Sequence, residues 1–244
     1  MVSERFIIGL DDTDILGGRG TSRIVREWTE VIESEGFART NGITRHQLLK
    51  STKIKATTHN RSVAVAIETD RTVFDIEDHL VQMVREHASG KANPAIAILT
   101  RHTDMPHVLA WGRRCQQEIL KLVDAERYAT ESNVLLRGLG GNRNGMIGAL
   151  AAVGLHAGGK DGVFIQLAGI RDLNGCITAG EIRERTALRH VIDEETGEEL
   201  DRDDLIDTGD RVRPRMIEGE PVLLTRSSRS DRKLWFTIDR ELAH

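Results

Sequence analysis

Carboxylate, glycine and hydroxyl residues crowd into one short stretch near the N-terminus, GLDDTDILGGRGTS (residues 9–22). Two carboxylates about 4 Å apart repel each other by roughly 4 kcal/mol at an effective dielectric constant of about 20, so such a group needs solvent, protonation or a cation. Mg²⁺ usually takes one or two carboxylates together with phosphate oxygens and water. We therefore expect Asp11, Asp12 and Asp14 to be metal-binding and catalytic residues.

The glycines that follow the aspartates predict a phosphate-binding loop. They allow backbone N–H groups to converge on an anion, and the N-terminus of the helix that follows adds its positive dipole end. Thr21 would be a catalytic phosphate acceptor or ligand. The spacing matches neither the Walker A loop nor the G-x-G-x-x-G dinucleotide pattern. The alternative is that Asp12 and Asp14 form Asx turns and that the glycines only shape a turn. The residues expected to bind a nucleotide here are Gly17, Gly18, Arg19, Gly20, Thr21 and Ser22.

Two further polar segments could contact the same ligands. The basic segment KSTKIKATTHNR (50–61) could neutralise a triphosphate, although a solvated loop explains each residue individually. The glycine-rich turn RGLGGNRNGMIG (137–148) precedes a helix, so it fits either substrate binding or close packing of a small-residue helix. From the first segment we expect nucleotide contacts by Lys53, Lys55, Asn60 and Arg61, and from the second, substrate contacts by Arg137, Arg143, Asn144, Gly145 and Gly148.

Short apolar strands and amphipathic helices alternate along the chain and must position these residues. This alternation predicts an α+β (mixed α/β) fold. The sequence becomes glycine-rich after about residue 130, so we divide the chain into domains 1–132 and 133–244. The second domain ends in a β-rich extension. The expected strands are 5–10, 42–49, 62–68, 94–100 and 163–169, and the expected helices are 21–36, 76–88, 107–127 and 146–155.

Composition restricts the class of protein. The content of 39% hydrophobic and 30% charged residues is that of a folded globular chain, and a net charge of −4 argues against a protein that coats nucleic acid. The two cysteines, Cys115 and Cys176, support neither a disulfide framework nor a zinc ribbon. Neither a signal peptide nor a span long enough for a bilayer is evident, so we expect a cytoplasmic protein without a membrane partner. Homo-oligomerisation stays open.

Four motifs resemble those of one family in both sequence and order. They are GLDDTD followed by GRGTS, THNRSVAVAIE (58–68) with Asn60, NPAIAIL (93–99) and NGMIGALAAVG (144–154). Together they are similar to motifs of the archaeal isoleucine-tRNA 2-agmatinylcytidine synthetases, over roughly residues 6–170. Asn144 departs from the pattern, because the family usually has a basic residue there.

The resemblance implies a kinase-like domain over 1–132 and a ferredoxin-like domain over 133–244. It also implies that Mg²⁺ and ATP phosphorylate the carbonyl of a wobble cytidine, after which the amine agmatine displaces the phosphate. Thr21 would be phosphorylated, and Asp11, Asp12 and Asp14 would hold metal and nucleotide. Family members that act on tRNA continue into an OB-fold and a cysteine zinc ribbon, and we expect neither in these 244 residues. The two scattered cysteines in particular cannot form the ribbon.

These observations lead to the hypothesis of an ATP- and Mg²⁺-dependent phosphoryl-transfer or ligase-type enzyme. It would activate an amide- or cytosine-like carbonyl for attack by an amine, on an acceptor different from that of the tRNA enzymes, such as a small molecule. Two alternatives stay open: a non-catalytic nucleotide-binding regulatory module, and a tRNA-modifying enzyme completed by a separate RNA-binding subunit. The expected cofactors are ATP and Mg²⁺, and the expected partners are a small-molecule or RNA acceptor and an amine.

Overall fold

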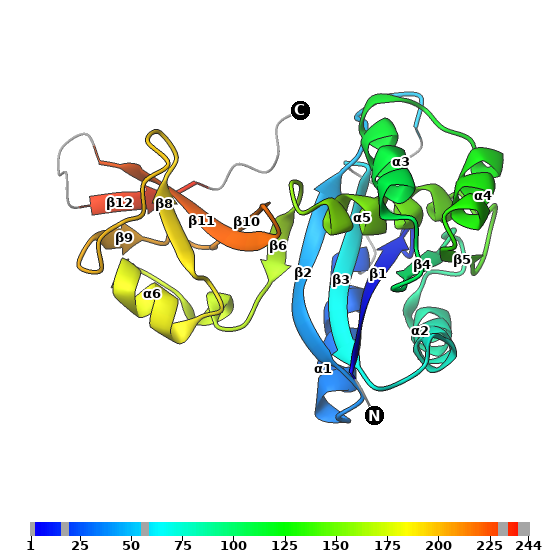
Figure 1. The fold of residues 1–244 in the computed structure, drawn as a ribbon, viewed down its shortest axis with the longest axis horizontal. Coiled ribbons are helices and arrows are strands. Elements are labelled where there is room, and N and C mark those ends of the chain that lie inside the picture. The colour runs from blue at the N-terminus through cyan, green and yellow to red at the C-terminus, as the bar shows by residue number, and fades with distance from the viewer. Residues whose placement is uncertain (1–2, 16–19, 55–58, 229–233, 239–244) are drawn as a thin grey trace. The chain divides into compact units, whose positions relative to one another are not determined.

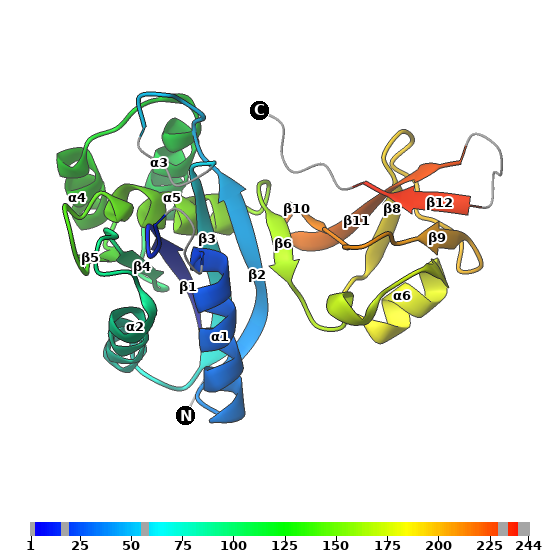
Figure 2. The same ribbon diagram turned by 180° about the vertical axis from the view of Figure 1, so that it is seen from behind.

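The computed structural model describes residues 3–15, 20–54, 59–228 and 234–238. The chain divides into two compact units, Met1–Gly158 and Gly159–His244, each of which combines strands and helices (Figures 1 and 2). The expected mixed α/β class is confirmed. Among the residues that the structure describes, no helix combines the length and the apolar character needed to cross a bilayer.

An antiparallel sheet organises the first unit, with the strand order β5-β4-β1-β3-β2. Its strands are β1 (Glu4–Asp11), β2 (Arg39–Gln47), β3 (Arg61–Thr69), β4 (Ala95–Leu99) and β5 (Leu135–Gly138). Its helices are α1 (Thr21–Ser34), α2 (Val73–His87), α3 (Met105–Gln117), α4 (Leu122–Glu131) and α5 (Gly145–Gly158). The strands expected near residues 5, 42, 62 and 94 and the helices near 21, 76 and 146 are thus present.

Side-chain alternation along β1 decides where its last carboxylate points. Successive residues of a strand face opposite sides of the sheet, so Ile7, Gly9 and Asp11 share one face and Ile8 and Leu10 the other. Ile7 packs in the apolar core built with residues of α3, α4 and α5, whereas α1 crosses the opposite face (Figure 2). The fold therefore directs Asp11 toward α5.

The domain division lies later in the chain than the sequence suggests. The elements β1-α1-β2-β3-α2-β4 form a β-α-β-β-α-β succession, the order that the term ferredoxin-like denotes. It lies in residues 4–99, whereas the resemblance places a ferredoxin-like domain in 133–244. Because β5 pairs with β4 and α5 packs on β1, residues 133–158 belong to the first unit.

The single helix expected over 107–127 is wrong, because two helices occupy this stretch. α3 ends at Gln117 and α4 begins at Leu122, and the backbone between them is extended at Glu118 (φ −129°) and Lys121 (φ −104°). The break does not fall at Gly112, which lies inside α3. A Cβ at Gly112 would lie 2.9 Å from Leu155 Cγ, so this glycine permits α3 to pack closely on α5.

Close backbone contacts hold α5 against β1. A Cβ at Gly9 would lie 2.3 Å from the carbonyl oxygen of Ala149, and a Cβ at Gly148 would lie 1.7 Å from Asp11 Oδ2. Both distances are far below a normal carbon–oxygen contact, so only glycine fits at either position without displacing its neighbour. The small residues of the 146–155 segment are therefore a packing requirement of the first unit.

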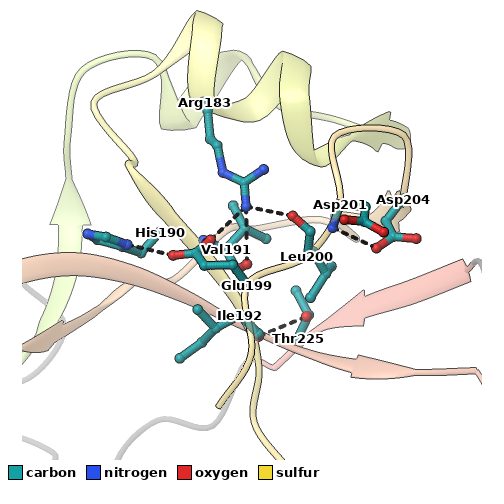
Figure 3. A network of polar contacts seen from close by, with 9 residues as sticks. All are labelled: Arg183, His190, Val191, Ile192, Glu199, Leu200, Asp201, Asp204 and Thr225. Carbon is teal, nitrogen blue, oxygen red and sulfur yellow. Dashed lines mark hydrogen bonds and ion pairs between the residues drawn. The ribbon is translucent and has the colours of Figure 1, made fainter. Parts of the chain in front are cut away.

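The second unit is rich in short strands around its own apolar core. A polar network centred on Glu199 ties its helix α6 to β8 (Figure 3). The Glu199 carboxylate accepts hydrogen bonds from Arg183 Nη2 at 2.7 Å and from His190 Nδ1 at 2.6 Å. The elements are β6 (Val163–Gln166), β7 (Cys176–Thr178), α6 (Ala179–Arg185), β8 (His190–Asp193), β9 (Leu205–Asp207), β10 (Arg215–Ile217), β11 (Glu220–Ser227) and β12 (Leu234–Thr237).

A buried polar cluster links β2 to α5 inside the first unit. Thr44 Oγ1 lies 2.7 Å from His156 Nδ1 and 2.9 Å from His46 Nε2, and all three residues are buried. Burial and, to a smaller extent, the neighbouring His46 and Arg5 lower the pKa of His156 to about 3. His156 is therefore neutral in the folded chain at neutral pH.

We predict that this histidine makes folding acid-sensitive. Its folded-state pKa lies below the unfolded value of about 6.5, so the unfolded chain takes up the proton first and stability falls as the pH drops through 6.5 toward 3. Between pH 7 and pH 5, His156 should contribute a loss of about 2 kcal/mol in unfolding free energy. Urea denaturation of His156→Gln should show a correspondingly flatter pH dependence. The exposed control His102→Gln should keep the wild-type slope, and an unchanged slope in His156→Gln would contradict the prediction.

Candidate functional site

A cavity of about 860 Å³ lies in the first unit, at the end of β1 that carries the aspartates. Its size is within the range of about 300–1,000 Å³ usual for small-molecule sites. The first residues of both α1 and α5 line it, so two helix N-termini open into the same space. Its polar and charged lining includes Asp11, Asp12, Asp14, Thr21, Ser22, Arg45, Lys53, His59, Asn60, Arg61, Asn93, Glu118, Lys121, Asn142 and Asn144.

Asp11 packs its carboxyl group against the first turns of α5. No Cβ intervenes at Gly148, which lets Asp11 Oδ2 approach the helix backbone closely. Burial, and secondly the charge of the adjacent Asp12, raise the pKa of Asp11 to about 8. In the metal-free chain Asp11 is therefore mostly protonated at neutral pH, and a bound cation would favour its charged form.

Asp12 is held in a backbone conformation that is uncommon for a residue with a side chain. Its φ is 51°, in the left-handed region. Asn93 stabilises it twice, because its Nδ2 donates to Asp12 Oδ2 at 2.9 Å and its backbone N–H donates to the carbonyl oxygen of Asp12 at 3.1 Å. This turn redirects the chain immediately after β1 and brings the Asp12 carboxylate to the cavity.

Asp14 and Thr13 fix the start of α1. The backbone N–H of Gly20 donates to Asp14 Oδ2 at 2.7 Å, and the buried Thr13 hydroxyl donates to Thr21 Oγ1 at 3.0 Å. Gly20 is the N-cap residue, and no side chain caps the helix. The first turn of α1 thus faces the cavity with its positive dipole end.

The three aspartates do not form a ready-made metal cage. Over the ranges that the structure describes, no group of three His, Cys, Asp or Glu side chains is placed to hold a metal ion. The reason is that Asp11 faces α5, Asp12 bonds Asn93 and Asp14 bonds Gly20. Mg²⁺ needs only one or two protein carboxylates when phosphate supplies further oxygens, so Mg²⁺ binding by two of these aspartates stays a prediction.

The basic segment reaches the cavity in part. Lys53, Asn60 and Arg61 line it. Asn60 Nδ2 donates to the carbonyl oxygen of Leu49 at 2.8 Å, and Arg61 Nε donates to Gln47 Oε1 at 3.0 Å, so both side chains also hold the β2–β3 connection in place. Lys55, Gly17, Gly18 and Arg19 lie outside the described residues, and their roles stay predictions.

The glycine-rich turn before α5 divides into two groups. Asn144, Gly145 and Gly148 line the cavity, whereas Arg137 and Arg143 are not among its lining residues. The Arg137 guanidinium pairs with the almost fully buried Glu77 at 2.5 Å, and Arg143 pairs with Glu126 at 3.1 Å. Substrate binding by these two arginines therefore has no support in the geometry.

Several residues that line the cavity were not predicted from the sequence. Arg45 and Lys121 add positive charge to the lining, and Asn93 bonds Asp12. The break between α3 and α4 contributes an apolar wall, and only the Asn-Pro pair before β4 marks Asn93 locally. The apolar lining residues are Ile15, Leu48, Ile54, Val63, Ile119, Leu120, Leu122 and Ile147.

Comparisons with known proteins support the fold. No protein-family model matches the sequence, and no curated protein matches it. Among solved structures, the tRNA fluorescent labeling enzyme and the complex of TiaS with an isoleucine tRNA and ATP each superpose with a TM-score of 0.56 at 25% identity. The complex of TiaS with the same tRNA, AMPCPP and agmatine gives 0.53 at 25% identity. Each match covers 62% of this chain and 36% of the other, so the chain spans about a third of its neighbours' length.

The matching solved structures agree with the resemblance that the sequence motifs showed. TiaS is a tRNA agmatidine synthetase, and the neighbours are therefore tRNA-modifying enzymes of the kind that the sequence motifs resemble. The first unit carries those motifs and also the cavity. The chain has a TiaS-like fold.

The buried carboxyl group of Asp11 should cost stability when no cation is bound. Its folded-state pKa lies above the unfolded value of about 3.9, so the unfolding free energy falls as the pH rises from about 4 through 8. Asp11→Asn removes this titration, so its stability relative to the wild type should increase by about 4 kcal/mol between pH 5 and pH 8. Urea denaturation in EDTA at both pH values measures this change. The exposed control Asp70→Asn should show no such pH-dependent gain, and a pH-independent difference for Asp11→Asn would refute the assignment.

Proposed function

We propose that this chain is an ATP-dependent, ligase-type enzyme that activates a carbonyl group of an RNA base for attack by an amine. The observation that carries the proposal is the meeting of Asp11 and Asp12 with the N-termini of α1 and α5 in one cavity. Carboxylates that hold a cation and helix N-termini that bind phosphate are the two halves of a metal–nucleotide site. The likeness to TiaS structures solved with tRNA and with ATP or AMPCPP supports the choice of ligands.

ATP fits the cavity in size and in chemistry. Its phosphates would lie at the first turns of α1 and α5, with Lys53 and Arg61 on the cationic side. The apolar wall from Ile119 to Leu122 would contact the adenine or the acceptor base. Asp11 and Asp12 would hold Mg²⁺, which supplies positive charge against the phosphate oxygens when bound.

The reaction is a phosphoryl transfer followed by a substitution. The carbonyl oxygen of the acceptor takes a phosphoryl group from ATP, forming an O–P bond as the bond to the nucleotide leaving group breaks. The amine nitrogen then attacks the activated carbon, the C–O bond breaks, phosphate leaves and the amine loses a proton to solvent. In this scheme Thr21 binds or transiently accepts the phosphoryl group, and the lysine and arginine side chains stabilise its charge.

The variant Asp12→Asn should distinguish a catalytic role of Asp12 from a purely structural role in the turn after β1. The substitution keeps the side chain's size but removes the charge expected to bind Mg²⁺, so we expect ATP turnover at least 100-fold below that of the wild type. Purified chain would be incubated with ATP and Mg²⁺, with and without tRNA and a primary amine, and modification of Thr21 would be mapped by mass spectrometry. Wild-type phosphate on Thr21 should be absent from Asp12→Asn.

The exposed Asp78→Asn on α2 is the matched control and should behave as wild type. Turnover in Asp12→Asn equal to that of the control would contradict the proposed role. Mg²⁺-dependent ATP binding without any turnover on RNA or small-molecule acceptors would favour a regulatory module instead.

A further inference from the structure

One amide side chain joins three segments that meet at the cavity. Asn93, just before β4, bonds Asp12 through both its side chain and its backbone. Its Oδ1 accepts a hydrogen bond from the backbone N–H of Asn142 at 2.9 Å, in the turn that leads to α5. A Cβ at Gly145 would lie 2.3 Å from the carbonyl oxygen of Asn93, so the first residue of α5 packs directly on it.

The Asn93 amide has a hydrogen-bond donor and an acceptor, and both are bonded at the site. The NH₂ group faces a carboxylate and the carbonyl oxygen faces a backbone N–H, so each polar atom has a matching partner. An aspartate at this position would present a second carboxylate to Asp12, and an apolar side chain would leave the Asp12 oxygen and the Asn142 N–H without these bonds. The amide thus sets Asp12 at a fixed place relative to the N-terminus of α5.

We propose that Asn93 is a positioning residue that orients the Asp12 carboxylate for Mg²⁺ and couples it to the phosphate-binding end of α5. Asn93 bonds Asp12 Oδ2, and Asp12 Oδ1 is the oxygen that we assign to the cation. This inference rests on the proposed function. Outer-shell partners of metal-binding carboxylates commonly change metal affinity by about 10–100-fold when removed.

The test measures binding rather than turnover. Calorimetry with a non-hydrolysable ATP analogue, titrated at several Mg²⁺ concentrations, gives the Mg²⁺ dependence of the dissociation constant. Asn93→Ala should raise the Mg²⁺ concentration needed for half-maximal binding at least tenfold. Thermal unfolding would establish that the variant is folded. Asn93→Ser, which replaces the amide with a shorter hydroxyl side chain, supplies a second variant for the same measurement.

A double-mutant cycle distinguishes positioning from a general structural effect. If Asn93 acts through Asp12, Asn93→Ala should cause no further loss in an Asp12→Asn background. Asn41 provides a matched control, because its Nδ2 donates to Glu68 Oε1 at the same 2.9 Å on the β2–β3 pair, outside the cavity lining. Asn41→Ala should leave the Mg²⁺ dependence unchanged.

The outcomes separate this inference from the proposed function. Wild-type binding that depends on Mg²⁺, together with unchanged binding by Asn93→Ala and Asn93→Ser, would overturn the inference alone. An equal loss on either Asp12 background would overturn it as well, because the effect would then not pass through Asp12. Absence of Mg²⁺-dependent binding by the wild-type chain would overturn both.

Discussion

The contact between α5 and the end of β1 determines how the site is built. Asp11 lies where a buried strand ends, and strand alternation turns its carboxyl group toward the helix rather than toward solvent. The helix can lie this close only because Gly148 lacks a side chain at the point where Asp11 Oδ2 approaches. One packing contact thus places a carboxyl group, the start of α5 and the Asp12 turn at the same edge of the sheet.

Electrostatics explains why this arrangement suits a charged ligand. A carboxyl group enclosed beside a second carboxylate is unfavourable in its charged form, as the raised pKa of Asp11 shows. In the proposed function a divalent cation would reverse that balance, with phosphate oxygens bound at the two helix N-termini. The unfavourable charged form of Asp11 would then favour cation binding, a common relation between stability and function in binding sites.

Local sequence features predicted the parts of the fold that local physics controls. The helical spacing of Ile24, Trp28 and Ile32 matches the buried face of α1, and the apolar runs around Ile8, Val65 and Ile98 form the central strands. The Asp and Gly run likewise marked the end of β1 and the start of α1 as one site.

Long-range contacts decided the features that the sequence did not reveal. The segment between Gln117 and Leu122 has neither glycine nor proline and keeps a helical pattern, yet the chain breaks there as α3 and α4 pack beside α5. Arg137 forms an ion pair with Glu77, which lies on α2, far from it in the sequence. Asn93 forms a hydrogen bond with Asp12, which is 81 residues away in the sequence. Without an observed partner, neither a basic side chain nor an amide can be assigned a role from its type alone.

A crystal structure of the full chain with Mn²⁺ and a non-hydrolysable ATP analogue would test whether Asp11 and Asp12 hold a cation beside a bound nucleotide. Anomalous scattering locates the metal independently of the protein coordinates. We expect one Mn²⁺ coordinated by the Asp11 and Asp12 carboxylates and by phosphate oxygens of the analogue at the N-termini of α1 and α5. Nucleotide bound outside this cavity, or metal without either carboxylate as a ligand, would contradict this expectation.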